Sequence, residues 1–359
     1  MNSMRNTRSF CKALCLLLCA LMTVPLAACG ETRQTQRAVF AMDTAMTLTA
    51  YGKMADRGLD AAESVIKSMD AMLDPELETS TVYAINHAQG SSTVVSGQIA
   101  DMLSKAHGIY QKTKAYNSSA VGMLDLTLYP LIKKWGFVDS KYYVPNDAEI
   151  QEQLARCCFD QMVLSSFPTS GAYSVTIPSY GELSFASCAK GSASQNAIDA
   201  MRQAGVTSGI ISLGGNVQTL GLKPDGSDWN VAIQDPNNTA SYLGVISVGE
   251  CAVVTSGSYQ RFFEDGKGNT YHHLISPTTG YPANNTLLSC TVITEDGTMA
   301  DRLSTAMFVL GETNALNYWR SNGGFEMILV TKSNEIICTK GLMERFTISN
   351  DTYTLTYKE

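Results

Sequence analysis

The chain has 359 residues, of which 45% are hydrophobic and 16% are charged. This composition is typical of a soluble globular protein, and it excludes a disordered chain and a polytopic membrane protein. The net charge is −7 and becomes more negative when the basic first 28 residues are left out, which argues against a nucleic-acid-binding protein.

The first 28 residues have the pattern of a bacterial signal peptide. Residues 1–12 are polar and basic, and residues 13–28 are almost entirely apolar. The apolar run is shorter than the roughly 20 residues that a membrane-spanning helix needs, and it fits the hydrophobic region of a signal peptide better. The run ends in Leu26-Ala27-Ala28-Cys29-Gly30, which resembles the lipobox of bacterial lipoproteins.

This resemblance implies cleavage before Cys29 and a diacylglycerol on its thiol. The expected location is therefore the extracytoplasmic face of the bacterial cell membrane, with the protein held there by its lipid. An uncleaved signal anchor with a chance cysteine is the alternative. Residues 29–38 are interpreted as a short polar tether, and residues 39–359 as the catalytic domain.

The ten cysteines do not indicate a disulfide scaffold. Three lie in the signal segment, and Cys29 is the expected lipid site. The other six are scattered and contain no C-x-x-C pair, which disfavours a structural zinc site. They are Cys157, Cys158, Cys188, Cys251, Cys290 and Cys338. The sequence leaves open whether they form bridges or stay reduced.

The first half of the catalytic domain is predicted to be mainly helical, after one strand over residues 46–51. Apolar residues at helical spacing predict two amphipathic helices, over 59–73 and 99–110. A short helix over 147–156 is expected to be capped by Asn146. Another helix is predicted after Gly191, with its end at Gly205.

The second half is predicted to be mainly β. Strands are expected over residues 208–213, 229–234, 243–248, 252–255 and 287–293. Two helices, over 301–310 and 312–321, interrupt the strands, and three further strands finish the chain. This mixed order, with no internal repeat or linker, predicts an α+β fold in one compact unit.

Three turns rich in glycine and serine lie beside predicted element ends: Ala189-Lys190-Gly191, Leu213-Gly214-Gly215-Asn216 and Thr255-Ser256-Gly257-Ser258. Glycine lets backbone N–H groups approach an anion closely. None of the three turns matches a Walker or dinucleotide fingerprint, so each one alone is also compatible with an ordinary tight turn.

Two further patterns contain residues suited to chemistry. The side chains of adjacent strand residues, such as His272 and His273, point to opposite faces, so the pair cannot easily bind one metal. Asp301, Ser304 and Thr305 open a predicted helix. They are interpreted either as an N-cap with a polar first turn or as a site for a hard cation such as Mg²⁺.

Seven segments, in the same order along the chain, resemble the ApbE family of FAD:protein FMN transferases. They are Met42-Asp43-Thr44, residues 124–131 with Trp135-Gly136-Phe137, Ala189-Lys190-Gly191, Leu213-Gly214-Gly215-Asn216, Thr255-Ser256-Gly257-Ser258-Tyr259, residues 273–282, and residues 300–306. Together they extend over most of residues 40–310.

The resemblance implies a mixed α/β fold of the ApbE flavin transferase type, with FAD held in a cleft. Proteins of this family use Mg²⁺ on the pyrophosphate of FAD, transfer FMN to a threonine hydroxyl of an acceptor flavoprotein, and release AMP. Matched by motif, the residues expected to contact FAD are Met42, Met123, Leu124, Asp125, Ser184, Lys190 and Ile275. The residues expected to hold the metal are Ser187, through its carbonyl, Asp301 and Thr305, with Ser304 as a further candidate.

His273 is the residue that the resemblance places in a catalytic role beside the phosphate. A threonine hydroxyl is a weak nucleophile and benefits from a base within hydrogen-bond reach. Histidine, with an ordinary pKa of about 6.5, can act as that base near neutral pH.

The chain departs from the family pattern at two positions. Ser184 stands where the family has the Asp of "D-L-G-x-x-x-K-G", and Ser276 stands where it has the Asp of "I-D-P-x-T-G". The tyrosine often found before Asp74-Pro75 is also missing. Ser184 and Ser276 motivate one alternative to the transferase, a lipid-anchored flavin-binding protein without activity. A second alternative is hydrolysis of FAD to FMN and AMP at the same metal site, with water in place of the acceptor threonine.

Two protein classes outside the family are disfavoured. A transporter's substrate-binding protein is disfavoured because the sequence shows no second similar lobe. A serine hydrolase built on Ser256 is disfavoured because the sequence there lacks the G-x-S-x-G elbow.

Overall fold

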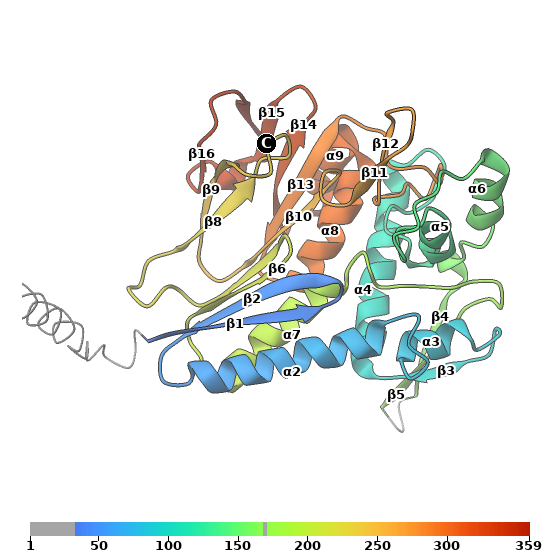
Figure 1. Ribbon diagram of the computed structural model, residues 1–359, viewed down its shortest axis with the longest axis horizontal. Helices are drawn as coiled ribbons and strands as arrows, with labels where there is room; N and C mark the ends of the chain where they lie inside the picture. Colours follow the sequence, from blue (N-terminus) through green and yellow to red (C-terminus); the bar gives the residue numbers. More distant parts are fainter. Residues whose placement is uncertain (1–32, 168–170) are drawn as a thin grey trace, which may run out of the picture.

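A computed structural model describes residues 33–167 and 171–359. The signal peptide over residues 1–28 and the lipid site at Cys29 lie outside the described residues. A nine-stranded sheet forms the centre of the fold, with helices on one face and a second, three-stranded sheet on the other (Figure 1). The expected α+β fold in one compact unit is confirmed.

The central sheet has the order β1-β2-β6-β7-β10-β13-β14-β15-β17, and every neighbouring pair is antiparallel except β15 and β17. Its strands are β1 (Gln34–Ala41), β2 (Thr44–Tyr51), β6 (Gly209–Leu213), β7 (Asn216–Leu220), β10 (Ala252–Gly257), β13 (Leu287–Thr294), β14 (Glu326–Thr331), β15 (Glu335–Thr339) and β17 (Thr354–Lys358). β1 begins inside the segment interpreted as a tether, so the tether prediction over residues 29–38 is wrong from Gln34 onward.

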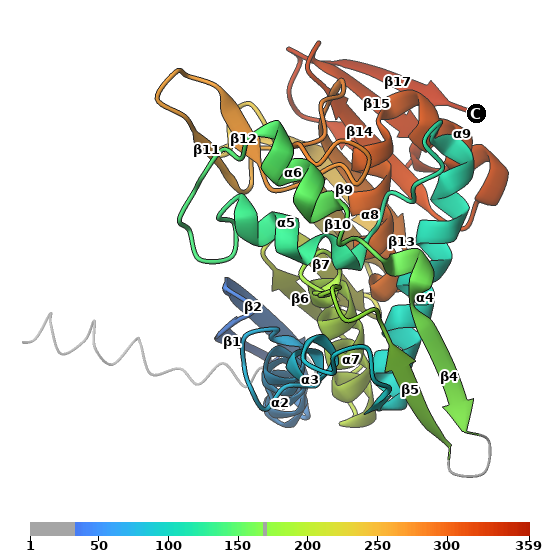
Figure 2. The same cartoon turned by 90° about the vertical axis from the view of Figure 1, so that its right-hand side faces the viewer.

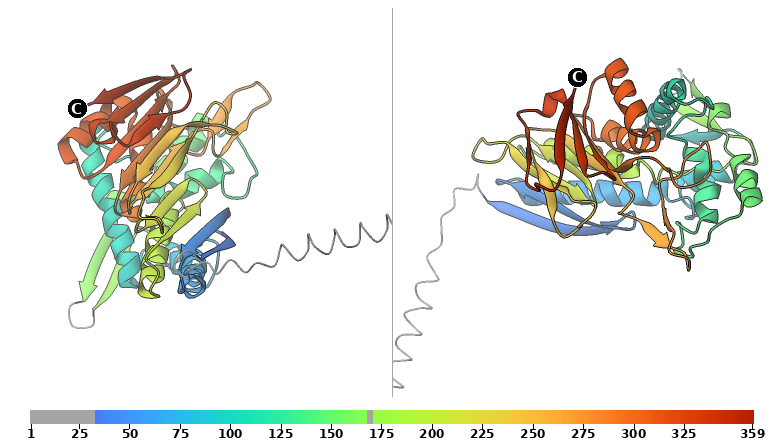
Figure 3. Two further views of the ribbon diagram at one scale, coloured as in Figure 1. Left: turned by 90° about the vertical axis from the view of Figure 1, so that its left-hand side faces the viewer. Right: turned by 90° about the horizontal axis from the view of Figure 1, so that it is seen from above.

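Five longer helices cover one face of this sheet: α2 (Ala55–Leu73), α4 (Gly97–Thr113), α7 (Ala189–Gln203), α8 (Gly297–Leu310) and α9 (Glu312–Asn322). α2 packs along α7 and also contacts β1 and β2 (Figure 3). The predicted helical periodicity is confirmed for α2, where Leu59, Ile66 and Leu73 are all buried. None of the helices in the described ranges combines the length and apolar character needed to cross a bilayer.

Three smaller groups of strands complete the fold. A sheet of order β16-β9-β8 packs on the second face of the central sheet; its strands are β8 (Trp229–Gln234), β9 (Tyr242–Val248) and β16 (Phe346–Ile348). A sheet of order β3-β5-β4 lies beside α4 (Figure 2); its strands are β3 (Thr93–Val95), β4 (Val163–Phe167) and β5 (Ala172–Thr176). The third group is the hairpin of β11 (Phe262–Glu264) and β12 (Thr270–His272).

Short helical segments connect these parts. They are α3 (Thr81–Asn86), α5 (Tyr129–Lys134), α6 (Asp147–Leu154), and the 3₁₀ turns η1 (Lys114–Tyr116), η2 (Leu126–Leu128), η3 (Phe159–Gln161) and η4 (Lys340–Leu342). The predicted cap of α6 is confirmed, because the Asn146 side chain accepts from the Glu149 N–H and the Glu149 side chain accepts from the Asn146 N–H. This reciprocal pair satisfies two N–H groups that a helix start leaves free.

The middle strands of the central sheet are buried on both faces. Along β10, Ala252 and Val254 pack on the helices, whereas Val253 packs on the three-stranded sheet. Successive side chains of a strand point to opposite faces, so a strand covered on both sides needs apolar residues at every position. This is why the strands of the second half appear in the sequence as continuous apolar runs.

Three predictions about the elements are wrong, two of them on where a helix begins and one on the number of strands. α8 begins at Gly297 with Asp296 as its N-cap, so Asp301 lies inside the helix and the N-cap interpretation of Asp301 fails. Four strands rather than three follow α9 among the described residues. α7 also begins earlier than expected, at Ala189.

The cap of α8 gives a test of this boundary. The Asp296 side chain accepts from the N–H groups of Thr298, at 2.8 Å, and Met299, at 3.2 Å. Asp296→Ala removes both bonds and should lower the free energy of unfolding by about 1 kcal/mol. Asp296→Asn keeps a capping oxygen, so its free energy of unfolding should stay within a few tenths of a kcal/mol of the wild-type value. Urea unfolding followed by circular dichroism measures both, and equal stabilities for the Ala variant and the wild type would contradict the assigned start of α8.

Candidate functional site

The site is organised where the first turn of α7 meets α8. The Gly191 N–H donates to Asp301 Oδ2 at 2.6 Å. A Cβ on Gly191 would lie 2.3 Å from Asp301 Cβ and 2.3 Å from the Gly297 carbonyl oxygen, so only glycine permits this approach. Lys190 and Gly191 therefore belong to a helix start rather than to a loop, and the positive end of α7 faces the carboxylate of Asp301.

The four residues expected to hold a metal lie together at this junction. Thr305 Oγ1 donates to the Ser187 carbonyl at 3.3 Å. Asp301 and Thr305 are four residues apart on α8, a spacing that puts them on the same helix face. The Ser256 hydroxyl of β10 lies 2.8 Å from Ser304 Oγ and 3.2 Å from Thr305 Oγ1. Sequence reasoning placed Ser256 only in a turn and missed this contact between β10 and α8.

These donors suit Mg²⁺. A carboxylate, a carbonyl and a hydroxyl are the oxygen ligands that this cation prefers, commonly completed by water and substrate phosphates. Within the described residues Asp301 Oδ1 accepts no hydrogen bond, so it is available to a cation. The Ser304 hydroxyl has another role, because it is fully buried and donates to the Asp301 carbonyl at 2.9 Å. This bond stabilises the cluster. No group of three or more His, Cys, Asp or Glu side chains that could hold a metal occurs in the described ranges.

Lys190 supplies positive charge next to this cluster. Its Nζ donates to the Gly214 carbonyl at 3.4 Å. Burial raises the pKa of Asp301 above its ordinary value, and the charge of Lys190 opposes that rise. The Lys190 charge also lowers the pKa of His273, so these three predicted residues act on one another electrostatically.

The turn at Gly214 brings the first sequence block into the site. Gly214 and Gly215 have φ values of 56° and 88°, and a Cβ on Gly214 would lie 2.4 Å from Thr44 Cγ2. Thr44 follows the β1–β2 turn, where Met42 has a φ of 50°. The Met42 N–H donates to Asp70 Oδ1 of α2 at 2.9 Å, which holds this left-handed turn in place. No motif or periodicity in the sequence singles out Asp70.

His273 follows β12 and is half-buried. Its Nδ1 lies 3.1 Å from the Arg261 carbonyl, and because a carbonyl only accepts, Nδ1 carries the proton and Nε2 is left as the acceptor. Burial lowers the pKa of His273 to about 3. The ring is therefore neutral at physiological pH, with Nε2 able to take a proton. The neighbouring His272 instead packs edge-on against Phe308 of α8, with the ring centroids 5.6 Å apart.

The segments of Asp125 and Ser184 lie side by side, because the Ser184 N–H donates to the Leu126 carbonyl at 3.0 Å. The Asp125 carboxylate accepts from the Thr127 N–H at 2.8 Å and from its hydroxyl at 2.6 Å. The side chains of Met123, Leu124 and Ile275 are buried in hydrophobic clusters, which leaves their backbone atoms as contacts for a ligand.

The two serines that replace family aspartates keep the local turns. Ser184 Oγ accepts from the Ala186 N–H at 3.2 Å, and Ser276 Oγ accepts from the Thr278 N–H at 3.3 Å. A bond from the side-chain oxygen to the N–H two residues ahead is the one an aspartate makes in an Asx-turn. The replacements therefore remove two negative charges without removing the turns.

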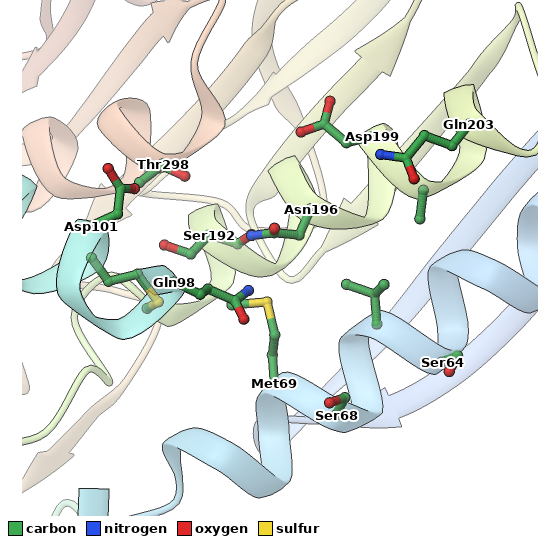
Figure 4. Close-up of a pocket in the computed structure, with 13 residues that line it drawn as sticks. Ser64, Ser68, Met69, Gln98, Asp101, Ser192, Asn196, Asp199, Gln203 and Thr298 are labelled. Atoms are coloured by element: carbon green, nitrogen blue, oxygen red, sulfur yellow. The ribbon is translucent and has the colours of Figure 1, made fainter. Parts of the chain in front are cut away.

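A groove of about 620 Å³ lies elsewhere, between α2, α4, α7 and the start of α8. In Figure 4, Met69 of α2 points toward Ser192 and Asn196 on α7. None of its lining residues is among the predicted site residues, although Ser192 directly follows Gly191.

Comparison with known proteins places this site in a family. The ApbE family matches residues 42–329. A relative from Treponema pallidum (strain Nichols), named FAD:protein FMN transferase, is 27% identical over 95% of this chain and 96% of its own. A relative of the same name from Klebsiella pneumoniae (strain 342) is 32% identical over 79% of this chain and 84% of its own.

Solved structures show the same fold. The ApbE protein from Thermotoga maritima superposes with a TM-score of 0.78 at 24% identity, covering 87% of this chain and 99% of that chain. The flavin transferase ApbE from Vibrio cholerae superposes with a TM-score of 0.76 at 22% identity, covering 87% of this chain and 99% of that chain.

The burial of Asp125 predicts a pH-dependent stability. Burial raises the pKa of Asp125 from 3.8 to about 6, against the opposing effect of the Thr127 hydrogen bonds. Between these two pH values the folded protein holds a proton on Asp125 that the unfolded chain has lost, so the burial of Asp125 destabilises the fold above pH 6 and this cost is relieved as the pH falls toward 4. The change in the free energy of unfolding that comes from Asp125 is about 3 kcal/mol, and Asp125→Asn should abolish this part of the pH dependence. Chemical unfolding of both proteins at pH 7, 6, 5 and 4 measures the difference, and a difference that stays constant with pH would contradict the assignment.

Proposed function

The chain belongs to the ApbE family, and from this premise we propose that it is a Mg²⁺-dependent FAD:protein FMN transferase. It transfers FMN from FAD to a threonine hydroxyl of an acceptor flavoprotein and releases AMP. The observation that carries the proposal is that Asp301, Thr305 and the Ser187 carbonyl lie together at the start of α7. Lys190 lies beside them, and its charge acts on both Asp301 and His273.

The residues that would hold Mg²⁺ are Asp301, Thr305 and the Ser187 carbonyl, with Ser304 and Ser256 supporting them. When bound, the cation supplies positive charge that offsets the charge developing on the pyrophosphate oxygens. Lys190 and the positive end of α7 add charge of the same sign from the protein itself.

His273 is the base that accepts the proton of the acceptor threonine. The threonine oxygen forms a bond to the FMN phosphorus while the bond from that phosphorus to the AMP oxygen breaks, and the hydroxyl proton passes to His273 Nε2. Free His273 is a weak base because burial lowers its pKa to about 3. The negative phosphates of FAD beside the ring would raise that pKa toward the working pH, so the base becomes effective only when substrate is present.

The proposed location is the extracytoplasmic face of the cell membrane, with the lipid on Cys29 as the anchor. The support is the lipobox-like sequence that precedes the folded body. β1 begins at Gln34, so only a few residues separate the proposed lipid from the sheet. The acceptor flavoprotein would then present its threonine on the same side of the membrane and close to its surface.

Transfer to the acceptor is tested by mixing the purified protein with FAD, Mg²⁺ and a flavoprotein domain that contains an acceptor threonine. We expect flavin fluorescence on the acceptor band in a denaturing gel and one AMP per label. Asp301→Ala should reduce the rate by about 10²-fold or more, as should EDTA, because the charge on the pyrophosphate is then not offset. The matched control is Asp199→Ala, which removes a carboxylate from the outer face of α7.

The outcomes of this experiment separate the alternatives. AMP without label on any threonine-bearing acceptor would favour hydrolysis of FAD. Bound FAD with neither AMP nor label would favour a flavin-binding protein and overturn the transferase assignment.

The role of His273 is tested by substituting each of two neighbouring histidines. His273→Gln should lower kcat by about 10²- to 10⁴-fold, the range for a lost general base, while FAD still binds. His272→Gln is the matched control, because this ring packs on Phe308 instead. Single-turnover labelling at saturating FAD measures both variants, and equal losses would show that the histidines act only through folding.

A further inference from the structure

We propose that Asn117 is a positioning residue that fixes the separation between the two backbone segments expected to contact the flavin; the inference rests on the proposed function. The first segment, residues 121–125, contains Met123, Leu124 and Asp125. The second, residues 273–280, begins at His273 and includes Ile275. Neither the family motifs nor the sequence patterns singled out Asn117.

Each segment is anchored separately to a different part of the fold. In the first segment, the Met123 N–H donates to Thr113 Oγ1 at the end of α4, at 2.9 Å. In the second, the Gly280 carbonyl accepts from Trp135 Nε1 after α5, at 2.9 Å. Trp135 and Ile275 lie in one hydrophobic cluster, whereas Leu274 of the second segment lies in the same cluster as Met123 and Leu124. Apolar packing therefore brings the two segments near each other, but because it is non-directional it does not by itself set the distance between their backbones.

The Asn117 amide joins the two segments. Its Nδ2 donates to the Val121 carbonyl at 2.9 Å and to Thr278 Oγ1 at 2.9 Å. These two bonds use both amide protons, and Oδ1 accepts from the Ser119 N–H at 3.3 Å. In the described part of the chain, no other hydrogen bond links Asn117 or residues 121–125 to residues 273–280.

The surrounding backbone holds the Asn117 amide in position. Asn117 is half-buried and ends η1, and its N–H donates to the Lys114 carbonyl at 3.2 Å. Its carbonyl accepts from the Ala120 N–H at 2.9 Å. On the opposite side, Thr278 is fixed by the bond from its N–H to Ser276 Oγ, so the serine that replaces a family aspartate also orients the partner of Asn117.

This arrangement predicts an effect on FAD binding rather than on the chemical step. Asn117→Leu keeps nearly the size of the side chain but removes both donated bonds and offers no acceptor to the Thr278 hydroxyl. The Kd for FAD should rise about tenfold, the size expected from losing two neutral hydrogen bonds. At saturating FAD, kcat and the KM for the acceptor should stay within about twofold of the wild type, because the N–H and Nδ1 of His273 are held separately by the Arg261 carbonyl.

The partner residue gives an independent variant. Thr278→Val removes the acceptor oxygen at constant shape and should raise the Kd for FAD in the same direction, whereas Thr278→Ser keeps the oxygen and should bind FAD like the wild type. The double variant Asn117→Leu/Thr278→Val should bind no more weakly than Asn117→Leu alone, because both changes remove the same link.

The matched control is Asn237→Leu, which removes two similar donated bonds outside the site. Asn237 Nδ2 donates to Asn334 Oδ1 at 3.1 Å and to the Tyr353 hydroxyl at 2.8 Å, beside the three-stranded sheet. This variant should leave the Kd for FAD unchanged. Quenching of flavin fluorescence measures the Kd in the absence of any acceptor, and thermal unfolding reports on folding in parallel.

The result that overturns the proposal is an unchanged Kd for FAD in both Asn117→Leu and Thr278→Val. Weaker FAD binding in Asn117→Leu with a wild-type Kd in Thr278→Val would also overturn it, because the link between the segments would then have no role. The measurement does not depend on transfer: if the wild type binds FAD but labels no acceptor, the proposed function fails while the proposal for Asn117 is still decided by the Kd values.

Discussion

The close approach of α7 and α8 at Gly191 is the constraint on which the site depends. Because Gly191 has no side chain, its N–H reaches Asp301 and the two helices can cross in contact. The same contact places the positive end of α7 against a buried carboxylate that would be costly without a compensating charge. The same contact also places the Ser187 carbonyl, four residues before Gly191, where it accepts a hydrogen bond from Thr305 Oγ1. One hydrogen bond thereby fixes the position of every oxygen expected to hold the metal.

The sequence could predict the elements whose pattern is local. Helical spacing in α2 and α4 and the capping box of α6 depend on neighbours within a few residues, and all three are confirmed. The start of α8 was missed because Asp301, inside the helix, is as good a local cap as Asp296, and only the contact with Gly191 distinguishes them. β1 was missed because half of its residues face solvent, so its polar composition resembles a tether.

The site shows the same division between local and long-range information. The motifs identify the residues expected to contact the ligand, but they do not reveal the contacts that hold those residues in place. Asp70 supports the turn at Met42 from α2, and Ser256 reaches Thr305 from β10. Both contacts join segments far apart in the sequence, and a single serine or aspartate without periodicity carries no signal of such a contact. The residues that bind ligand are recognisable from one sequence, whereas their supports require the fold.

The two serine replacements show why the chemistry of a site and its shape can change separately. An aspartate at position 184 or 276 would both close a turn and add a negative charge near a ligand that carries phosphates. Serine keeps the bond to the N–H two residues ahead, so the turn survives, while the charge is lost. Among the predicted site residues, Asp125 and Asp301 are then the two buried carboxylates that remain. Asp125 accepts from the Thr127 N–H and hydroxyl, and Asp301 accepts from the Gly191 N–H, so hydrogen bonds compensate both buried carboxylates, and for Asp301 the Lys190 charge adds to that compensation.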